Sequence, residues 1–436
     1  MKKRQSLWIS CSNALLIVLI LLNCFPWTVS AAPRIQKTKT PIIIMIDPGH
    51  GGENEGTKDG VVLEKEMNLI TALVMKEELS NFEGIEVYLT RDGDYDLSLK
   101  DRAKAAESVH ADFLISLHYN ASESHALFGS EAWISLNQDY HNQGYQLGTM
   151  FLREFRDMGL TLRGIKTRRH SKGNDYYGVI REAVTLGIPA IIVEHCHVDH
   201  KNDAGFCDSK EDWEAFGRAD ARAVAKYFGL KSTKLGIDYS KEAETLPEVV
   251  PGTLVPRATQ DTTPPELCHV ALNSAKFDED KVSLTVSARD PESNLAFYSY
   301  SLDGGETFTE TYPWPEGDIL TGIFEGSFTI ELDVPDGTIP EICFRAANPY
   351  DLDCVSNVIT FNQTFEKPVV EEVPEETSLE DATEKLTAPA DAIAEKETQV
   401  FTYLQLCIVI VASLFVLFLV AYLIHARKNL KSGKAK

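Results

Sequence analysis

Four polar side chains in this sequence have the types and positions that metal-assisted hydrolysis requires. His50 follows an apolar run and an Asp-Pro-Gly turn, His118 ends the segment DFLISLH, Glu194 ends IPAIIVE, and Glu64 stands just ahead of a predicted helix. In open α/β sheets, ligands bind at the carboxyl ends of the strands. Two imidazoles with one carboxylate form a common catalytic zinc set, and a further carboxylate can act as general base. The pattern therefore predicts a zinc site with Glu194 as the base.

Each of these residues also has an ordinary interpretation. A histidine after a strand can be a satisfied loop residue, and Glu64 in the first turn of a helix suits the helix dipole without binding a ligand. Glu194 is harder to explain in this way, because a carboxylate on an apolar strand is costly to bury without a partner.

The elements that must position these side chains alternate between strand-like and helix-like patterns over residues 41–230. Strands are expected at 42–46, Ile85–Thr90, Asp112–His118, Glu131–Leu136 and Ile188–Glu194, and helices at Asn68–Leu79, Leu97–Ser108, Gln143–Met158 and Trp213–Phe228. This alternation predicts an α/β fold with a mixed, largely parallel sheet flanked by helices. The polar stretch Arg168–Tyr177 is expected to be an exposed loop, with lining of the cleft as the alternative.

A second folded unit is predicted after a proline-containing linker at residues 231–261. Residues 262–362 contain short segments of period-two alternation, such as Lys281–Arg289, separated by turn sequences. About seven short strands in about a hundred residues are typical of an immunoglobulin-like β-sandwich. The unit carries no catalytic cluster, so we expect it to act as a spacer, with docking or a protein partner as the alternative.

Both ends of the chain have the composition of membrane-targeting segments. Residues 1–31 show the basic start, apolar core and small residues of a cleaved signal peptide, with an uncleaved anchor as the alternative. Residues 403–424 are nearly all apolar and long enough to form a transmembrane helix, and the basic tail 425–436 favours the cytosol. With the acidic segment 363–402 as a disordered stalk, the sequence predicts a single-pass protein of the cell membrane whose folded part is extracytoplasmic.

Charge and cysteine usage exclude further classes of protein. The 436 residues carry a formal net charge of −23, whereas nucleic-acid binding needs a basic surface, so nucleic acid is not an expected partner. No CxxC sequence occurs, which makes a thiolate zinc site unexpected. For disulfides, Cys343 with Cys354 fits a hairpin best, and Cys196 with Cys207 is the other near pair.

Five motifs of the first region give a specific resemblance. DPGHGG, LEKEMNL, the run YLTR–D–SLKDRAKAAE, DFLISLHYNAS and PAIIVEHC occur in this order. Over residues 42–230 the chain resembles the zinc-dependent N-acetylmuramoyl-L-alanine amidases, the bacterial autolysin and spore amidase family known as amidase 3. The resemblance implies Zn²⁺ held by His50, Glu64 and His118, with Glu194 as catalytic acid/base. It also implies peptidoglycan as substrate, cleaved between the lactyl group of muramic acid and L-alanine, with the domain facing the cell wall.

Some residues near these motifs keep two interpretations. Arg91 and Arg102 match the family run and are expected to form structural ion pairs, with substrate contact as the alternative. Asn120 is a candidate for shaping the pocket. After Glu194 the chain departs from the family pattern with His195, Cys196, His197 and His200. The histidines are expected to lie in a loop at the rim, with a second metal site as the alternative.

Two other functions remain as alternatives to the amidase. One is a non-catalytic protein that binds the cell wall or has a structural role and retains the fold. The other is a zinc peptidase that acts within the stem peptide, although no HExxH sequence occurs to support it.

Overall fold

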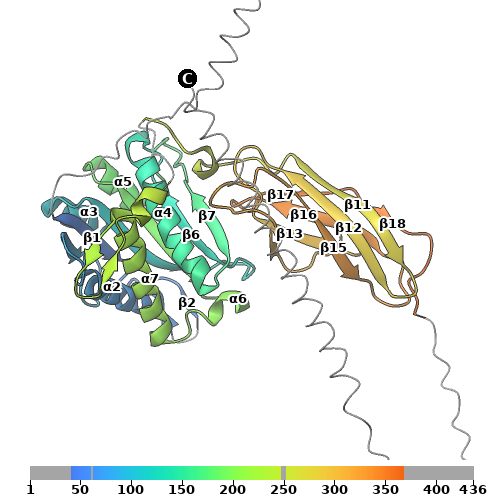
Figure 1. Ribbon diagram of the computed structural model, residues 1–436, viewed down its shortest axis with the longest axis horizontal. Helices are drawn as coiled ribbons and strands as arrows, with labels where there is room; N and C mark the ends of the chain where they lie inside the picture. Colours follow the sequence, from blue (N-terminus) through green and yellow to red (C-terminus); the bar gives the residue numbers. More distant parts are fainter. Residues whose placement is uncertain (1–40, 60–61, 247–251, 368–436) are drawn as a thin grey trace, which may run out of the picture. The chain divides into compact units, whose positions relative to one another are not determined.

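The computed structural model describes residues 41–59, 62–246 and 252–367 (Figure 1). The predicted signal peptide, transmembrane helix and tail, and most of the predicted stalk, lie outside these ranges. Among the residues that are described, no helix is both long and apolar enough to span a membrane.

The first region is built on one six-stranded sheet with the order β4-β1-β5-β8-β6-β7. Its strands are β1 (Ile42–Pro48), β4 (Ile85–Leu89), β5 (Phe113–Asn120), β6 (Ser130–Ile134), β7 (Leu162–Lys166) and β8 (Ala190–His197). All neighbours in this sheet run parallel except β6 and β8, which are antiparallel. The prediction of a mixed, largely parallel sheet is therefore confirmed.

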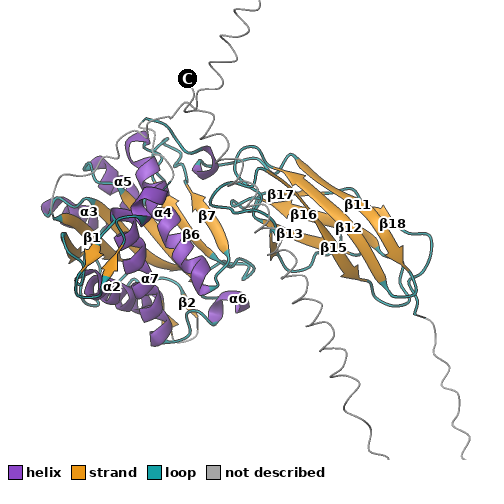
Figure 2. Ribbon diagram, in the orientation of Figure 1, coloured by secondary structure: helices purple, strands orange, loops and turns teal. Residues whose placement is uncertain are grey.

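Helices pack on both faces of this sheet, as Figures 1 and 2 show. One core contains residues of α2 (Glu64–Leu79), α4 (Gln138–Met158) and α7 (Lys210–Phe228), and the other contains residues of α3 (Leu99–Ser108) and α5 (Gly178–Thr185). Successive side chains of a strand point to opposite faces. Within β1, Ile44 and Ile46 accordingly enter the first core, whereas Met45 enters the second.

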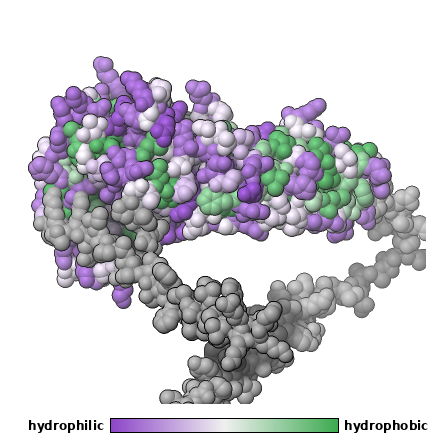
Figure 3. Space-filling view, turned by 90° about the horizontal axis from the view of Figure 1, so that it is seen from above, coloured by the Kyte–Doolittle hydropathy of each residue, from purple (hydrophilic) through white to green (hydrophobic). Residues whose placement is uncertain are grey.

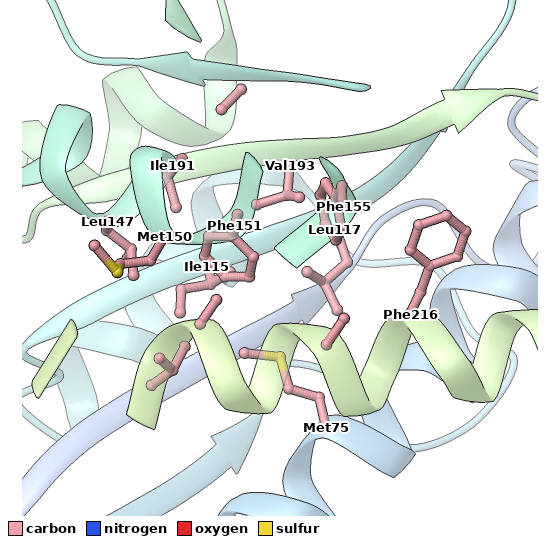
Figure 4. Packing of buried hydrophobic residues seen from close by; sticks show 14 of the residues in the cluster. Met75, Ile115, Leu117, Leu147, Met150, Phe151, Phe155, Ile191, Val193 and Phe216 are labelled. Carbon is pink, nitrogen blue, oxygen red and sulfur yellow. The ribbon is translucent and has the colours of Figure 1, made fainter. Parts of the chain in front are cut away.

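The larger core is formed by buried hydrophobic side chains that pack against one another (Figure 4). Met75 of α2, Phe151 of α4 and Phe216 of α7 are fully buried against Ile115 of β5 and Val193 of β8. Burying a side chain of this size contributes about 1.5–3 kcal/mol. The core thereby fixes the strands whose carboxyl ends carry the candidate site.

Shorter elements connect the sheet to the rest of the chain. They are β2 (Lys58–Asp59), β3 (Val62–Leu63), α6 (Lys201–Ala204), β9 (Lys231–Ser232), β10 (Ile237–Asp238) and the 3-10 turns Glu242–Thr245 and Pro256–Ala258. Ile237, Tyr239 and Ala258, which lie in the predicted linker, pack against the larger core. The described part of 231–261 therefore lies along the first region, and the predicted domain boundaries stay predictions.

Residues 262–367, here called the β region, form two antiparallel sheets around a common core. The strands are β11 (Leu267–Lys276), β12 (Lys281–Arg289), β13 (Phe297–Ser301), β14 (Tyr312–Pro313), β15 (Glu325–Asp333), β16 (Glu341–Ala347), β17 (Asp353–Val355) and β18 (Ile359–Thr360). One sheet has the order β11-β12-β15, and the other has β14-β13-β16-β17 with β18 also on β16. Val282 and Leu284 of the first sheet meet Ile342 and Phe344 of the second. The immunoglobulin-like type remains a prediction.

The surface shown in Figure 3 mixes hydrophilic and hydrophobic residues, so no single apolar face dominates that view of the described residues. Contacts unite the first region and the β region in one compact unit.

The proposed pairing of Cys343 with Cys354 is wrong in this structure, in which the five described cysteines are free thiols. Cys354 is the register partner of Ala346 in the pairing of β17 with β16. It therefore does not face Cys343, which lies three residues earlier in β16. Its thiol neighbour is instead Cys268 of β11. Cys196 and Cys207 do lie side by side, as predicted, but without a disulfide.

Candidate active site

His50 occupies a strained loop just beyond the end of β1. Its φ of 61° lies in the left-handed region, which non-glycine residues rarely adopt and which clusters at functional sites. Arg102 donates to the His50 carbonyl at 2.7 Å, and Arg91 donates to the Gly49 carbonyl at 2.8 Å. The His50 Nδ1 lies 3.0 Å from Asn54 Oδ1, which orients the ring so that Nε2 faces Glu64.

Glu64 is the first residue of α2, four residues earlier than the predicted helix start. Its side chain is buried, and its two oxygens face different histidines: Oε2 is 3.1 Å from His50 Nε2, and Oε1 is 2.9 Å from His118 Nδ1. Backbone amides of Thr57 and Tyr119 also donate to the carboxylate, at 2.7 and 3.1 Å. These contacts hold the carboxylate between the two imidazoles.

His118 completes a group of three possible metal ligands. One ligand atom from each of His50, Glu64 and His118 lies within 4.8 Å of the other two. In the described part of the chain, this is the one such group of histidine, cysteine and carboxylate side chains. Zinc sites bind nitrogen and oxygen ligands at about 2.0–2.2 Å, so the three atoms are close enough for small adjustments to bring them around one ion.

Two glycines keep space around the three ligands. A Cβ on Gly49 would lie 2.2 Å from His118 Cε1, and a Cβ on Gly56 would lie 2.5 Å from Glu64 Oε2 and 2.7 Å from His50 Cδ2. Side chains at these positions would push the ligands out of place. The requirement for glycine explains why the loops on either side of His50 are glycine-rich.

The site is electrostatically matched to a cation. Burial opposes ionisation of Glu64, but hydrogen bonds from His118 and His50 outweigh it and hold the pKa of Glu64 below its usual value. Burial lowers the pKa of His50, but the hydrogen bond and the charge of Glu64 raise it by more, so the net shift is upward. A carboxylate that stays ionised between two imidazoles is the donor set expected of a metal site.

Glu194 lies beside this group on β8. It pairs in register with His118 of the parallel strand β5 and with Glu131 of the antiparallel strand β6. Register partners point to the same face of a sheet. Burial, followed by the charges of Glu64 and Glu131, raises the pKa of Glu194 well above its usual value, and Lys166 opposes that shift. Perturbed carboxyl groups of this kind are typical of catalytic acids and bases.

Sequence reasoning missed a buried polar cluster next to Glu194. Glu131 Oε2 accepts from Lys166 Nζ at 2.5 Å and from Arg163 Nε at 3.1 Å, and its Oε1 accepts from Trp133 and Asn120. Asn120 therefore acts on the site through Glu131. The charges of Lys166 and Arg163 outweigh burial and lower the pKa of Glu131 to about 2. The same signal that marked Glu194, a carboxylate inside a predicted strand, was present at Glu131.

Arg91 and Arg102 have the structural role that was predicted for them, although only one forms the expected ion pair. Arg102 Nη1 contacts Asp47 Oδ1 at 2.8 Å, and both side chains are buried. Arg91 instead donates to backbone carbonyls, including those of Pro48 and Lys65. Both arginines thus fix the loop that carries His50.

The prediction that the histidines after Glu194 lie in a loop is wrong for His195 and His197, because β8 continues through both and buries them. His195 Nε2 is 2.9 Å from Asp220 Oδ2, and its Nδ1 is 2.8 Å from the His118 carbonyl. His200 stacks on Phe128. None of the three belongs to the ligand group formed by the described residues. The Arg168–Tyr177 segment is mostly exposed, as predicted.

Comparisons with known proteins agree on the first region. A family model described as N-acetylmuramoyl-L-alanine amidase matches residues 44–226. The N-acetylmuramoyl-L-alanine amidase CwlM of Bacillus licheniformis is 31% identical over 188 residues, which is 43% of this chain and 69% of that protein. The sporulation-specific N-acetylmuramoyl-L-alanine amidase of Bacillus subtilis is 30% identical over 191 residues, 44% of this chain and 69% of its own length.

Among solved structures, the catalytic domain of CwlV, an N-acetylmuramoyl-L-alanine amidase from Bacillus (Paenibacillus) polymyxa var. colistinus, is 27% identical. The match covers 43% of this chain and 99% of the CwlV chain, with a TM-score of 0.38.

Proposed function

This chain belongs to the N-acetylmuramoyl-L-alanine amidase family, and from that membership we propose how its residues act on peptidoglycan. The chain is a peptidoglycan hydrolase, and it cleaves the amide bond between N-acetylmuramic acid and the L-alanine of the stem peptide. One observation carries the proposed mechanism: the ligand atoms of His50, Glu64 and His118 converge within 4.8 Å, next to the strand that carries Glu194.

We propose Zn²⁺ as the cofactor, held by His50, Glu64 and His118. Two imidazoles and one carboxylate are a common ligand set for catalytic zinc, and the space kept by Gly49 and Gly56 supports the fit. When bound, zinc would act as a Lewis acid that activates water and polarises the scissile carbonyl. The hydrogen bond that His50 Nδ1 donates to Asn54 Oδ1 is the outer contact that orients a metal-binding imidazole.

Glu194 acts as the general base in this proposal. Its carboxylate takes a proton from the attacking water and returns it to the nitrogen of the leaving L-alanine. The upward shift in the pKa of Glu194 suits this exchange, because a base works best when its pKa lies near the operating pH. Its backbone lies in a buried strand of the sheet, which fixes where the side chain begins.

The two alternative functions make different predictions about products. A zinc peptidase would release amino termini within the stem peptide, and a non-catalytic wall-binding protein would release none. The retention of His50, Glu64, His118 and Glu194 in one arrangement favours catalysis, since a binding protein has no need of them.

The deciding experiment is digestion of purified sacculi by the full chain in detergent. We expect new L-alanine amino termini and free lactyl carboxylates in equal amounts. A chelator should abolish both products, and added zinc should restore them. Other amino termini would indicate the peptidase, and the absence of products with zinc-loaded protein would overturn the hydrolase assignment.

We further propose that the hydrolase works from the cell membrane, with its catalytic region facing the cell wall. Support comes from sequence alone: the signal-like residues 1–31, the apolar segment 403–424 and the basic tail 425–436. Protease digestion of intact protoplasts tests this topology, because an outward-facing catalytic region would be cut.

A further inference from the structure

Residues 348–352, the loop of the β region between β16 and β17, contact the buried cations Arg163 and Lys166 beside Glu131. We propose that this loop, by way of Asp351 and Tyr350, positions the buried Glu131–Lys166 pair next to Glu194 and is therefore required for full catalytic activity. The inference rests on the proposed role of Glu194. It assigns to the β region a function beyond that of a spacer.

The first link joins Glu194 to Glu131. The two residues are register partners on β8 and β6, so their side chains project side by side from one face of the sheet. Two adjacent carboxylates repel each other unless cations are fixed near them. Lys166 is such a cation, because its Nζ contacts Glu131 Oε2 at 2.5 Å, next to the register partner Glu194. A displacement of Lys166 would therefore move Glu131, the carboxylate beside the general base.

The second link joins this pair to the β region. Arg163 Nη2 donates to both carboxylate oxygens of Asp351, at 2.5 and 2.7 Å, while Arg163 Nε contacts Glu131. Lys166 Nζ donates to the Pro349 carbonyl at 3.1 Å. The side chains of Arg163 and Lys166 are only 2% and 4% exposed. Cations buried to this degree need partners on every side, and the loop supplies those that the catalytic region lacks.

Tyr350 of the same loop also contacts the first region. Its hydroxyl accepts a hydrogen bond from the Thr167 amide at 3.1 Å and donates one to the Thr259 carbonyl at 3.0 Å. Its ring centroid lies 5.8 Å from Lys166 Nζ, and the Trp133 ring centroid lies 4.5 Å from the same nitrogen. Aromatic rings from both regions therefore contact the lysine, and each adds a weak cation–π attraction.

The loop is built to hold this conformation. Asn348 is fully buried, and its Oδ1 accepts from the amides of Tyr350 and Leu352 at 3.0 and 3.2 Å. Its Nδ2 donates to buried carboxylates of Asp261 and Asp290. Asp351 adopts a φ of 60°, in the left-handed region that aspartate tolerates better than most residues. The turn that Asn348 holds thus presents Asp351 to Arg163.

Other contacts between the two regions are of a different kind. Arg156 with Asp318 and Lys201 with Glu310 are ion pairs between largely exposed side chains, and such pairs contribute little. Phe297 of the β region packs against Phe128, and its ring lies 5.0 Å from Arg163 Cζ, so this contact belongs with the loop and is not used as a control. The two exposed ion pairs provide controls that separate docking in general from the effect of the loop.

The test compares three variants of the full chain on a soluble muramoyl peptide. Asp351→Asn removes the charge that faces Arg163. Asp353→Asn is the matched control, because Asp353 is similarly exposed and pairs at 2.9 Å with Arg345 inside the β region. Asp318→Asn removes an ion pair between the regions that does not include Glu131, Arg163 or Lys166. For each variant, kcat, KM, zinc content and the thermal midpoint are measured.

We expect Asp351→Asn to lower kcat about tenfold, with KM and zinc content within about twofold of the original, because misplacing a catalytic group slows chemistry more than binding. Asp351→Glu, which restores the charge, should recover part of kcat. Both control variants should keep kcat within about twofold. If Asp351→Asn does not fold, Tyr350→Phe replaces it, and a fall in kcat of about threefold or more is expected.

Two results would overturn the inference while leaving the amidase intact. The first is that the original protein is active and that Asp351→Asn leaves its kcat unchanged. Where Tyr350→Phe is used instead, an unchanged kcat in that variant has the same meaning. The other is an equal fall of kcat in the Asp318→Asn control, which would indicate docking alone. Inactivity of the original zinc-loaded protein would instead contradict the proposed function.

Discussion

His118 of β5 and Glu194 of β8 are register partners in the sheet, so a candidate metal ligand and the candidate base project from the same face of two neighbouring strands. Both strands are buried in the cores on either side. Residues on rigid strands keep a more constant separation than residues on loops. This pairing makes it possible to separate metal binding from proton transfer by single substitutions.

The substitution Glu194→Gln should abolish turnover and leave zinc content near normal. Loss of a general base costs about 10²- to 10⁴-fold in rate, whereas the three proposed ligands stay in place. Hydrolysis of a muramoyl peptide and zinc analysis of the purified variant check both parts. The exposed Glu107→Gln on α3 serves as control. Normal activity of Glu194→Gln would refute the role given to Glu194.

The substitution His118→Ala should instead remove zinc and activity together. It deletes one of three ligands and leaves the Glu64 carboxylate without the partner at 2.9 Å. Zinc content is measured after dialysis against a weak chelator. His125→Ala, at a largely exposed histidine that contacts Asp199, is the matched control and should keep its zinc. Full metal occupancy in His118→Ala would remove that residue from the ligand set.

A methyl group at position 49 should disturb the site without replacing any of the three ligand residues. The Cβ of Gly49→Ala would come within 2.2 Å of the His118 ring, and displacement of a metal ligand by its surroundings typically costs about 10- to 100-fold in metal affinity. Gly205→Ala is the control, because nothing lies within 4 Å of its Cβ. Zinc titration of both variants checks the prediction, and equal affinities would show that the His118 ring tolerates the methyl group.

Much of this site could be predicted from the sequence, because the signals are local. The apolar runs that lead to His118 and Glu194 end in these polar residues, and His50 directly follows the Asp-Pro-Gly turn after the first run. In a largely parallel sheet, those ends meet along one edge. The fold class follows from the same alternation of strands and helices, and the structure confirms it.

The features that were missed depend on contacts between distant parts of the chain. β7 shows little apolar periodicity, because two of its five residues are the cations Arg163 and Lys166, buried by partners such as Asp351 about 190 residues later. β8 continues past Glu194 because Asp220 of α7 supplies a partner that lets His195 be buried. No local pattern records such partners, so these polar residues resemble those of loops.

The pH dependence of stability should reveal the buried pair of Glu131 with Lys166. The pKa of Glu131 is lowered from 4.5 to about 2. As the pH falls, Glu131 therefore takes up a proton in the unfolded protein before it does so in the folded protein. The stability that the ionised Glu131 contributes is complete above pH 4.5 and is lost as the pH falls from 4.5 towards 2. A shift of this size corresponds to about 3 kcal/mol of unfolding free energy.

Glu131→Gln should therefore be less stable than the original protein by about 3 kcal/mol at neutral pH, with a difference that shrinks as the pH falls below 4.5. Urea unfolding at pH 7, 4.5 and 3.5 measures the difference. Glu107→Gln, at an exposed position on α3, should differ little from the original protein at any of these values. A difference for Glu131→Gln that stayed constant with pH would mean that lost packing, and not the charge held by Lys166 and Arg163, accounts for the effect of the substitution.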